Sequence, residues 1–140
     1  MCYIGRLDND SSVAKLATED IVVWKVANII AKDNIVAPVK VYDYTLKKYH
    51  RATKLGVELV DYYIRIEEGF HSFAAFKHAE NVIRNYDCYC KCYIPKGSIY
   101  FSDGEEVVSQ DLVFVKAYVD APWYYKLLGI KLKCIHTWKD

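Results

Sequence analysis

The residues of this chain that could do chemistry gather in one stretch, Gly69-Phe70-His71-Ser72-Phe73. A strand-like run ends at the glycine, and the apolar periodicity that follows predicts a helix over 74–86. Ser72 is a suitable N-cap for that helix, with His71 at the bend before it. Such a corner places polar side chains and free backbone N–H groups at the edge of a scaffold, where a ligand can reach them. The stretch is therefore the predicted centre of a binding site.

Three cysteines at alternate positions, Cys88, Cys90 and Cys92, are the first candidates for metal ligands. On a strand their thiols would project from one face about 7 Å apart, whereas zinc needs sulfurs arranged around one point, usually supplied by a turn. We therefore expect these cysteines to pack as small core hydrophobes. The histidines lack the H-x-x-x-H spacing of a metal-binding helix, so the sequence predicts no metal site.

Several classes of function are disfavoured by what the sequence lacks. It has no Gly-x-Ser-x-Gly nucleophile elbow and no glycine-rich phosphate loop. Its formal net charge of +1 over 140 residues predicts no surface for nucleic acid. No segment approaches the ~20 apolar residues of a membrane-spanning helix, and the odd number of cysteines, 5, fits a reducing compartment. We expect a cytoplasmic protein with no cofactor, no nucleic-acid partner and no membrane partner.

The rest of the chain must supply the scaffold for the Gly69–Phe73 stretch. Residues 1–18 are polar and turn-rich and predict an N-terminal arm, and the remaining length fits a single domain over 19–140. The basic stretch 45–55 predicts a solvated loop. Alternating or continuous apolar runs predict strands elsewhere. These strands are expected over residues 21–26, 36–44, 59–66, 87–94, 99–101, 105–109, 112–119 and 130–138.

A second, short helix is expected near the C-terminus. Asp120 is suited to its cap, Pro122 to its first turn and Gly129 to its end. The expected order along the chain is several strands, one central helix, further strands, this short helix and a final strand. This order is an α+β pattern. The fold expected is a mainly antiparallel twisted sheet.

The middle of the chain resembles ADP-ribosyltransferases of the poly(ADP-ribose) polymerase type. In that family a first strand carries a His-Gly motif, a Gly-x-Tyr-Phe corner opens a helix, and a Glu-x-Val-Val strand supplies the catalytic glutamate. The order is similar over about residues 20–120. The resemblance implies an ADP-ribosyltransferase-like fold in which Glu105 or Glu106 holds a ribose hydroxyl. The corresponding segments are Val22–Ala27, Gly69–Phe73, Ala74–Tyr86, Tyr89–Ile94 and Glu105–Val108.

This chain departs from the family at the residues that carry the chemistry. Trp24-Lys25-Val26 stands where the family has its histidine and glycine, and Phe70 or His71 stands at the tyrosine of the second motif. The resemblance then implies a site that lacks the residue fixing the nicotinamide ribose. We expect binding without catalysis and assign no catalytic residue.

A second resemblance is to small proteins of gut bacteria and their phages. It is carried by the Met-Cys-Tyr-Ile start, the Val-Trp-Lys-Val strand, Gly-Phe-His-Ser-Phe and Ile-Pro-Lys-Gly-Ser-Ile-Tyr-Phe. Several compact phage proteins of this size act as sponges that capture nucleotide immune signals. The resemblance implies phage counter-defence in the cytoplasm of an infected bacterial cell.

The leading hypothesis from the sequence is a non-catalytic protein that sequesters a small ligand derived from NAD or a cyclic nucleotide. Such a protein needs preformed hydrogen-bond donors for phosphate, an aromatic side chain to stack on the base, and polar groups to hold the ribose. Phosphate or ribose is assigned to the corner, and phosphate to Lys96 and Ser98. Base stacking is assigned to Tyr42 or Tyr44, and a ribose hydroxyl to Glu106. The predicted ligand-binding residues are Phe70, His71, Ser72, Lys96, Ser98, Tyr42, Tyr44 and Glu106.

Two alternatives stay open at the level of the sequence. One is an active transferase on NAD, with Glu105 or Glu106 polarising the ribose. The other is a protein interaction module that uses its tyrosine-rich surface and has no small ligand. The 13 tyrosines and 3 tryptophans also favour a homo-oligomer.

Overall fold

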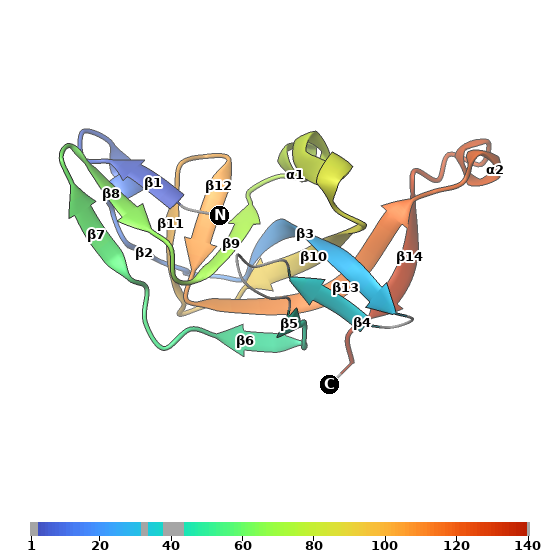
Figure 1. The fold of residues 1–140 in the computed structure, drawn as a ribbon, viewed down its shortest axis with the longest axis horizontal. Helices are drawn as coiled ribbons and strands as arrows, with labels where there is room; N and C mark the ends of the chain where they lie inside the picture. The colour runs from blue at the N-terminus through green and yellow to red at the C-terminus, as the bar shows by residue number, and fades with distance from the viewer. Residues whose placement is uncertain (1–2, 32–33, 38–43, 140) are drawn as a thin grey trace.

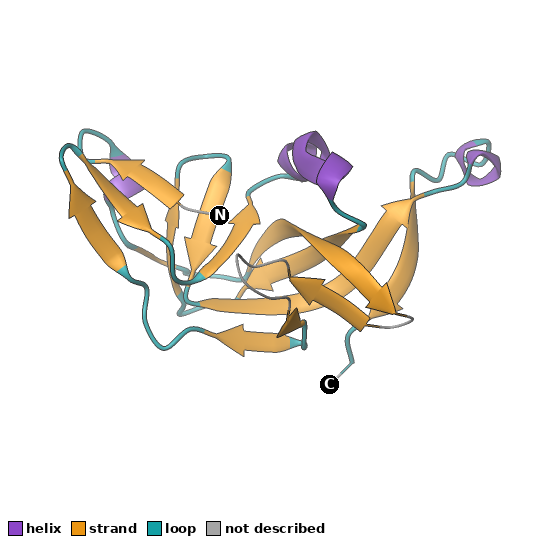
Figure 2. Ribbon diagram, viewed as in Figure 1, coloured by secondary structure: helices purple, strands orange, loops and turns teal. Residues whose placement is uncertain are grey.

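The computed structural model describes residues 3–31, 34–37 and 44–139. In these ranges the chain is mostly antiparallel sheet with two short helices, so the predicted α+β class is confirmed (Figures 1 and 2). The elements are β1 Tyr3–Arg6, η1 Asp10–Ser12, β2 Lys15–Leu16, β3 Ile21–Ala31, β4 Asn34–Ala37, β5 Tyr44–Thr45, β6 Tyr49–Arg51, β7 Val57–Val60, β8 Tyr63–Ile66, β9 Phe70–Phe73, α1 Phe76–Val82, η2 Ile83–Asn85, β10 Cys88–Ile94, β11 Ile99–Ser102, β12 Glu106–Ser109, β13 Asp111–Asp120, α2 Trp123–Lys126 and β14 Leu132–Thr137.

Two sheets make up the fold. The large sheet runs β14-β13-β10-β3-β9-β12-β11-β2, with β6 added on the first part of β13, and β4 and β5 extending from β3. The small sheet has the order β1-β8-β7 and lies at one end of the molecule, while α2 lies at the other end (Figure 1). The first eighteen residues, expected as an arm, contribute β1 to the small sheet and β2 to the large one.

Strand β10 lies at the centre of the large sheet and is covered on both faces. Cys88, Cys90 and Cys92 are fully buried in the main core, with 0% exposure, so their assignment as small core hydrophobes is confirmed. On the opposite face Tyr89 packs under α1 with its ring centroid 4.7 Å from that of Phe76. Alternation along the strand sends the thiols one way and the tyrosines the other.

The small sheet packs on the outer side of β11 and β12 through a separate core. Tyr3, Ile64 and Ile66 meet Phe101 and Val108 there. Its connection to the large sheet runs through Gly69, whose φ of +107° is in the region that favours glycine. A Cβ on Gly69 would also lie 2.4 Å from Leu55 Cδ2, so Leu55 would have to move, and it is the positive φ that requires the glycine.

The predicted strand-to-helix corner at Gly69–Phe73 is wrong. The four residues after the glycine form β9, which pairs with β12 in the register Ser72 to Val107. Ser72 is therefore not a helix cap: it is buried within the strand, and α1 begins at Phe76 after Ala75, which makes no side-chain cap bond. In β9, Phe70 and Ser72 point to one face and His71 and Phe73 to the other, as in a strand that is covered on both faces. Pairing with β12 makes this segment a strand and not a helix start.

Three smaller predictions are also corrected. The single strand expected over 59–66 is a hairpin, β7 and β8, that turns at Asp61, whose φ is +50°. Aspartate tolerates this conformation better than most residues. The loop expected over 45–55 contains β6, which pairs with β13. Asp120 ends β13 instead of capping a helix, because α2 begins only at Trp123 after Pro122.

A buried carboxylate joins β6, β13 and the turn before β11. Asp111 is 3% exposed, and its Oδ2 accepts a hydrogen bond of 2.9 Å from the hydroxyl of Ser98. Its Oδ1 accepts a hydrogen bond from the hydroxyl of Tyr49 and lies 3.3 Å from the guanidinium of Arg51. The backbone N–H of Asp111 donates to Ser98 Oγ over 3.1 Å. This network fixes the first part of β13.

Replacing Asp111 by alanine should lower the free energy of unfolding by roughly 2–4 kcal/mol, because the buried hydroxyl of Ser98 loses its charged acceptor and the links to Tyr49 and Arg51 are lost. Asp8→Ala is the matched control, since its ion pair with Arg6 is exposed and should contribute less than about 1 kcal/mol. Urea unfolding followed by circular dichroism measures both. Equal losses in the two variants would contradict the role assigned to Asp111.

Candidate interaction surface

Phe70 and Ser72, two of the predicted ligand residues, face the interior of the protein. Phe70 packs against the main core, and its ring centroid is 5.7 Å from that of His50. Ser72 is 1% exposed, and its hydroxyl has no hydrogen-bond partner within the described part of the chain. Both side chains point to the same face of β9 because they are two residues apart. A ligand at the molecular surface would not reach Ser72.

His71 and Glu106 share the opposite face of the large sheet. In the pairing of β9 with β12, Glu106 lies opposite Phe73 and Val108 lies opposite His71. His71 and Glu106 are thus diagonal neighbours, a spacing at which long side chains interact. The structure therefore brings together two residues that the sequence assigned to one ligand site.

Burial holds both of these groups toward their neutral forms. It lowers the pKa of His71 to about 4, although a contact of 3.1 Å between its Nε2 and the carbonyl of Glu67 acts in the opposite direction. Burial also raises the pKa of Glu106, and the nearby carboxylates of Asp103 and Glu105 add to that increase. Burial therefore disfavours the charged form of both groups.

The other predicted ligand residues are elsewhere. Lys96 is exposed in the turn after β10, where its backbone N–H donates to Asp20 Oδ1 over 3.0 Å. Ser98 is buried, and its hydroxyl is engaged with Asp111. Tyr42 lies outside the described residues, and of Tyr44 only the backbone, at the start of β5, is described. The residues that are described belong to both faces of the sheet and form no single surface.

Lys25 has a role that was not predicted from the sequence. Strands β3 and β9 pair only at Trp24 and Phe73 and then separate, which leaves the carbonyl of His71 without a strand partner. The ammonium of Lys25 donates to that carbonyl over 2.7 Å. Burial lowers the pKa of Lys25. A lone lysine at an inward position of the apolar run Ile21–Ala27 was the signal that could have identified it.

The small sheet ends in an apolar edge. Across its strands, fully buried Ile66 is paired with Val57, and buried Ile64 is paired with Leu59. Directly opposed residues share a face. Val57 and Leu59 therefore lie on the same face of the small sheet as Ile64 and Ile66, which pack in the core between the small sheet and β11 and β12. They are nevertheless 50% and 73% exposed. We call these two residues of β7 the β7 overhang.

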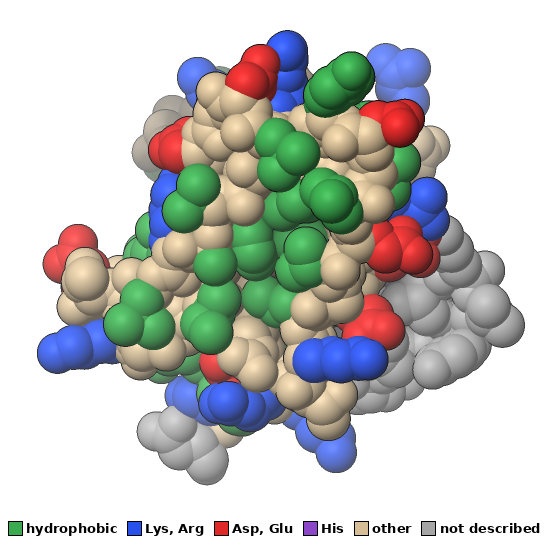
Figure 3. All heavy atoms as spheres, turned by 90° about the vertical axis from the view of Figure 1, so that its left-hand side faces the viewer, with side chains coloured by type: hydrophobic (Ala, Val, Ile, Leu, Met, Phe, Trp, Pro, Cys, Tyr) green, Lys and Arg blue, Asp and Glu red, His purple; other side chains and the backbone are tan. Residues whose placement is uncertain are grey.

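Strand β7 has a free edge as well as apolar side chains. In the part of the chain that the structure describes, its only strand partner is β8. The opposite face of the small sheet is charged, since Arg65 lies between Glu58 and Glu67 in ion pairs. Apolar side chains gather in the centre of this end of the molecule and charged ones lie around them (Figure 3). This end of the molecule therefore combines apolar side chains with a charged border.

A shallow depression adjoins the turn between β7 and β8. Its volume is about 440 Å³, and it is lined by Arg6, Leu7, Asp8 and Tyr62. Half of Leu7 and 87% of Tyr62 are exposed, and the Arg6–Asp8 ion pair of 2.9 Å is also at the surface. Walls this exposed would enclose little of a small ligand, whereas a protruding side chain of a partner could rest there.

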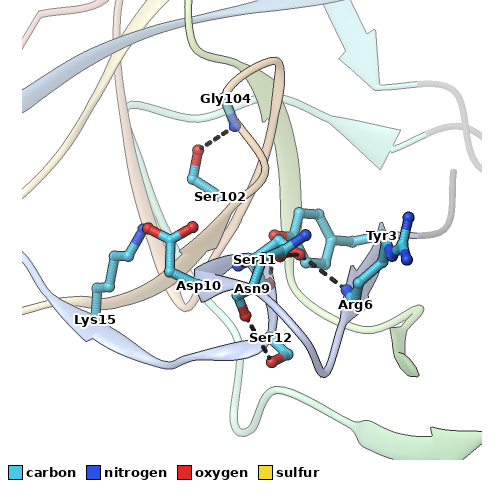
Figure 4. Close-up of polar contacts among 9 residues, drawn as sticks. All are labelled: Tyr3, Arg6, Asn9, Asp10, Ser11, Ser12, Lys15, Ser102 and Gly104. Carbon is cyan, nitrogen blue, oxygen red and sulfur yellow. Dashed lines mark hydrogen bonds and ion pairs between the residues drawn. The ribbon is translucent and has the colours of Figure 1, made fainter. Parts of the chain in front are cut away.

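The neighbouring strand β1 is held firmly in place. The hydroxyl of Tyr3 donates to the carbonyl of Ser11 over 2.6 Å, and the N–H of Arg6 donates to Ser11 Oγ over 2.8 Å (Figure 4). A Cβ on Gly5 would lie 2.3 Å from the same carbonyl, so only glycine allows η1 to approach this closely. The surface next to the depression is thus preformed.

Comparisons with models of protein families, with curated proteins and with solved structures give no match. Over residues 3–31, 34–37 and 44–139, no three His, Cys, Asp or Glu side chains are grouped so as to hold a metal ion. In the same ranges no helix has both the length and the apolarity needed to cross a bilayer.

The lowered pKa of His71 predicts sensitivity to acid. Its ordinary value is 6.5 and its value in the fold is about 4, so the unfolded chain binds the proton first as the pH falls. Stability should decrease between pH 6.5 and pH 4, by about 1–2 kcal/mol after allowance for partial exposure.

His71→Gln removes this titration and should flatten that part of the stability profile. Glu106 acts in the opposite sense because its pKa is raised, so the readout is the difference between the His71→Gln variant and the wild type. Unfolding in urea at a series of pH values measures it. A constant difference across this pH range would show that His71 does not carry the effect.

Proposed function

We propose that this chain is a non-enzymatic interaction module that binds an extended segment of a partner protein along the free edge of β7. The observation that carries the proposal is the β7 overhang, in which Val57 and Leu59 continue a buried apolar face beyond its cover. An added strand would supply main-chain hydrogen bonds to the edge and cover for the side chains.

The chemistry of the bound segment follows from the two faces of the small sheet. Side chains of an added strand alternate, so one set would lie beside Val57 and Leu59 and the other beside Glu58 and Arg65. The first set should be apolar and the second polar or charged. The depression beside Tyr62 would accept a larger side chain at one end of the segment.

Selection of peptides from a displayed random library against the immobilised protein tests this proposal. Peptides that alternate apolar and polar residues should be enriched, and Leu59→Lys should weaken their binding by about tenfold or more, since the leucine would lose its burial. Leu16→Lys is the matched control, because Leu16 is also an exposed leucine on a short edge strand.

Both substitutions replace exposed side chains, so both variants should keep the melting temperature of the wild type. Enriched peptides that bind the Leu59→Lys variant as tightly as the wild type would place the docking site elsewhere. Enrichment of no peptide at all would count against strand addition.

Nucleotide capture is the second candidate function, and one observation favours it. Pairing of β9 with β12 puts His71 and Glu106 on one face, where the resemblance to ADP-ribosyltransferases assigned the corner and the ribose contact. In this proposal the sheet is of the ADP-ribosyltransferase type, and the protein sequesters a signal derived from NAD or a cyclic nucleotide during phage counter-defence.

Incubation with NAD, ADP-ribose, cyclic ADP-ribose or cyclic dinucleotides distinguishes the candidates. Capture predicts a raised melting temperature, loss of that shift in a His71→Ala, Glu106→Gln double variant, and recovery of unchanged ligand after heating. Release of nicotinamide would instead indicate a transferase. If no nucleotide raises the melting temperature, nucleotide capture is wrong, and the strand-binding proposal is unaffected.

A further inference from the structure

The second exposed apolar surface lies at the opposite end of the molecule from β7. Strands β13 and β14 extend past the body of the protein, and α2 lies at their end (Figures 1 and 2). Four side chains there form what we call the α2 tip, and most of the surface of three of them is exposed. They are Trp123 at 73%, Tyr124 at 51%, Leu127 at 77% and Leu128 at 75%.

Backbone hydrogen bonds hold the α2 tip in one conformation. The N–H of Leu127 donates to the carbonyl of Trp123 over 3.3 Å, and the N–H of Ile130 donates to the carbonyl of Tyr125 over 3.0 Å. At the base of the tip, Ala121 donates to the carbonyl of Lys131 over 2.9 Å. The exposure of the apolar side chains is therefore built into the hairpin end.

The charges around the tip are mainly positive. Lys126 is the one charged residue between Trp123 and Ile130. Lys133 is exposed on β14 close to the tip, where it lies opposite Val119. Lys131 is partly neutralised by Glu80, which it meets at 3.0 Å. Asp120 at the end of β13 is the opposing charge, so the apolar tip has a net positive border.

We propose that the α2 tip inserts into the headgroup region of an anionic lipid bilayer. Tryptophan and tyrosine prefer the boundary between water and hydrocarbon, and leucine supplies apolar area to bury below it. Lysines beside such a surface are attracted to anionic lipids. The whole segment Trp123–Ile130 has eight residues, far fewer than the ~20 of a membrane-spanning helix, so the protein would lie on the membrane.

The charge and shape of the tip favour lipid over protein as the occupant. If two copies paired through their tips, Lys126 of one copy would lie close to Lys126 and Lys133 of the other, and this repulsion is unfavourable. A projecting end also needs a matching groove in a protein partner, whereas a lipid surface adapts to it. The sequence-based expectation of no membrane partner came from a search for spanning segments, which a short tip escapes.

Fluorescence of Trp123 gives a direct test of this proposal. Trp138 is 7% exposed and Trp24 is half-buried, so a spectral change on membrane binding reports mainly Trp123. Vesicles of phosphatidylcholine with phosphatidylserine should shift the emission to shorter wavelength and sediment the full-length protein. Phosphatidylcholine alone should bind it more weakly. Trp123→Phe should remove the spectral shift and keep most of the co-sedimentation.

Variants of the tip separate insertion from other causes of binding. Leu127→Asp combined with Leu128→Asp should lower partition into the vesicles by about tenfold or more. Lys126→Glu should weaken binding only to vesicles that contain phosphatidylserine. Leu16→Asp, at an exposed leucine near the opposite end, is the control and should bind like the wild type. Unchanged melting temperatures establish that the variants are folded.

Three outcomes would overturn the proposal. One is that the wild type neither sediments with vesicles nor changes its emission at low salt. Another is that the double aspartate variant binds vesicles as well as the wild type, which would place the contact elsewhere. The third is that the protein does not bind vesicles and that the tip variants have a lower molar mass in solution than the wild type. That result would show that a second copy covers the tip.

Discussion

Burial of both faces of β10 is the constraint on which the rest of the structure depends. Its three cysteine thiols need cover on one side and Tyr89 needs cover on the other. The first side is closed by the main core, and the second by α1, with Phe76 against Tyr89. The outer face of the large sheet is covered mainly by the short helix α1 and the three-stranded small sheet. These two elements do not cover every apolar side chain of the fold.

The two surfaces proposed for binding, the β7 overhang and the α2 tip, are apolar regions that no other element covers in the part of the chain that the structure describes. At β7 a buried face continues into the exposed Leu59, and at the end of β13 the hairpin carries the α2 tip beyond the body. Exposed apolar groups in continuous patches commonly mark sites of interaction. Because the two patches are at opposite ends of the molecule, a partner bound at β7 would leave the tip free.

Local patterns predicted the central strands well and the candidate site poorly. The alternation of Cys88 to Ile94 allows only a strand with one thiol face. Ser72 has the same local signature in a strand as at a helix cap, and pairing with β12 decided between them. The hairpin at Asp61 carries no glycine to mark it. Exposure of Leu59 depends on which strand ends the small sheet, and no local pattern contains that information.

Amide hydrogen exchange of the protein with and without a selected peptide tests the central claim most directly. If the peptide adds a strand to β7, the amides of Val57–Val60 should become protected, while those of β14, the edge strand at the other end of the large sheet, should exchange as before. Protection confined to any other element, or exchange in β7 that is unchanged by a bound peptide, would contradict it.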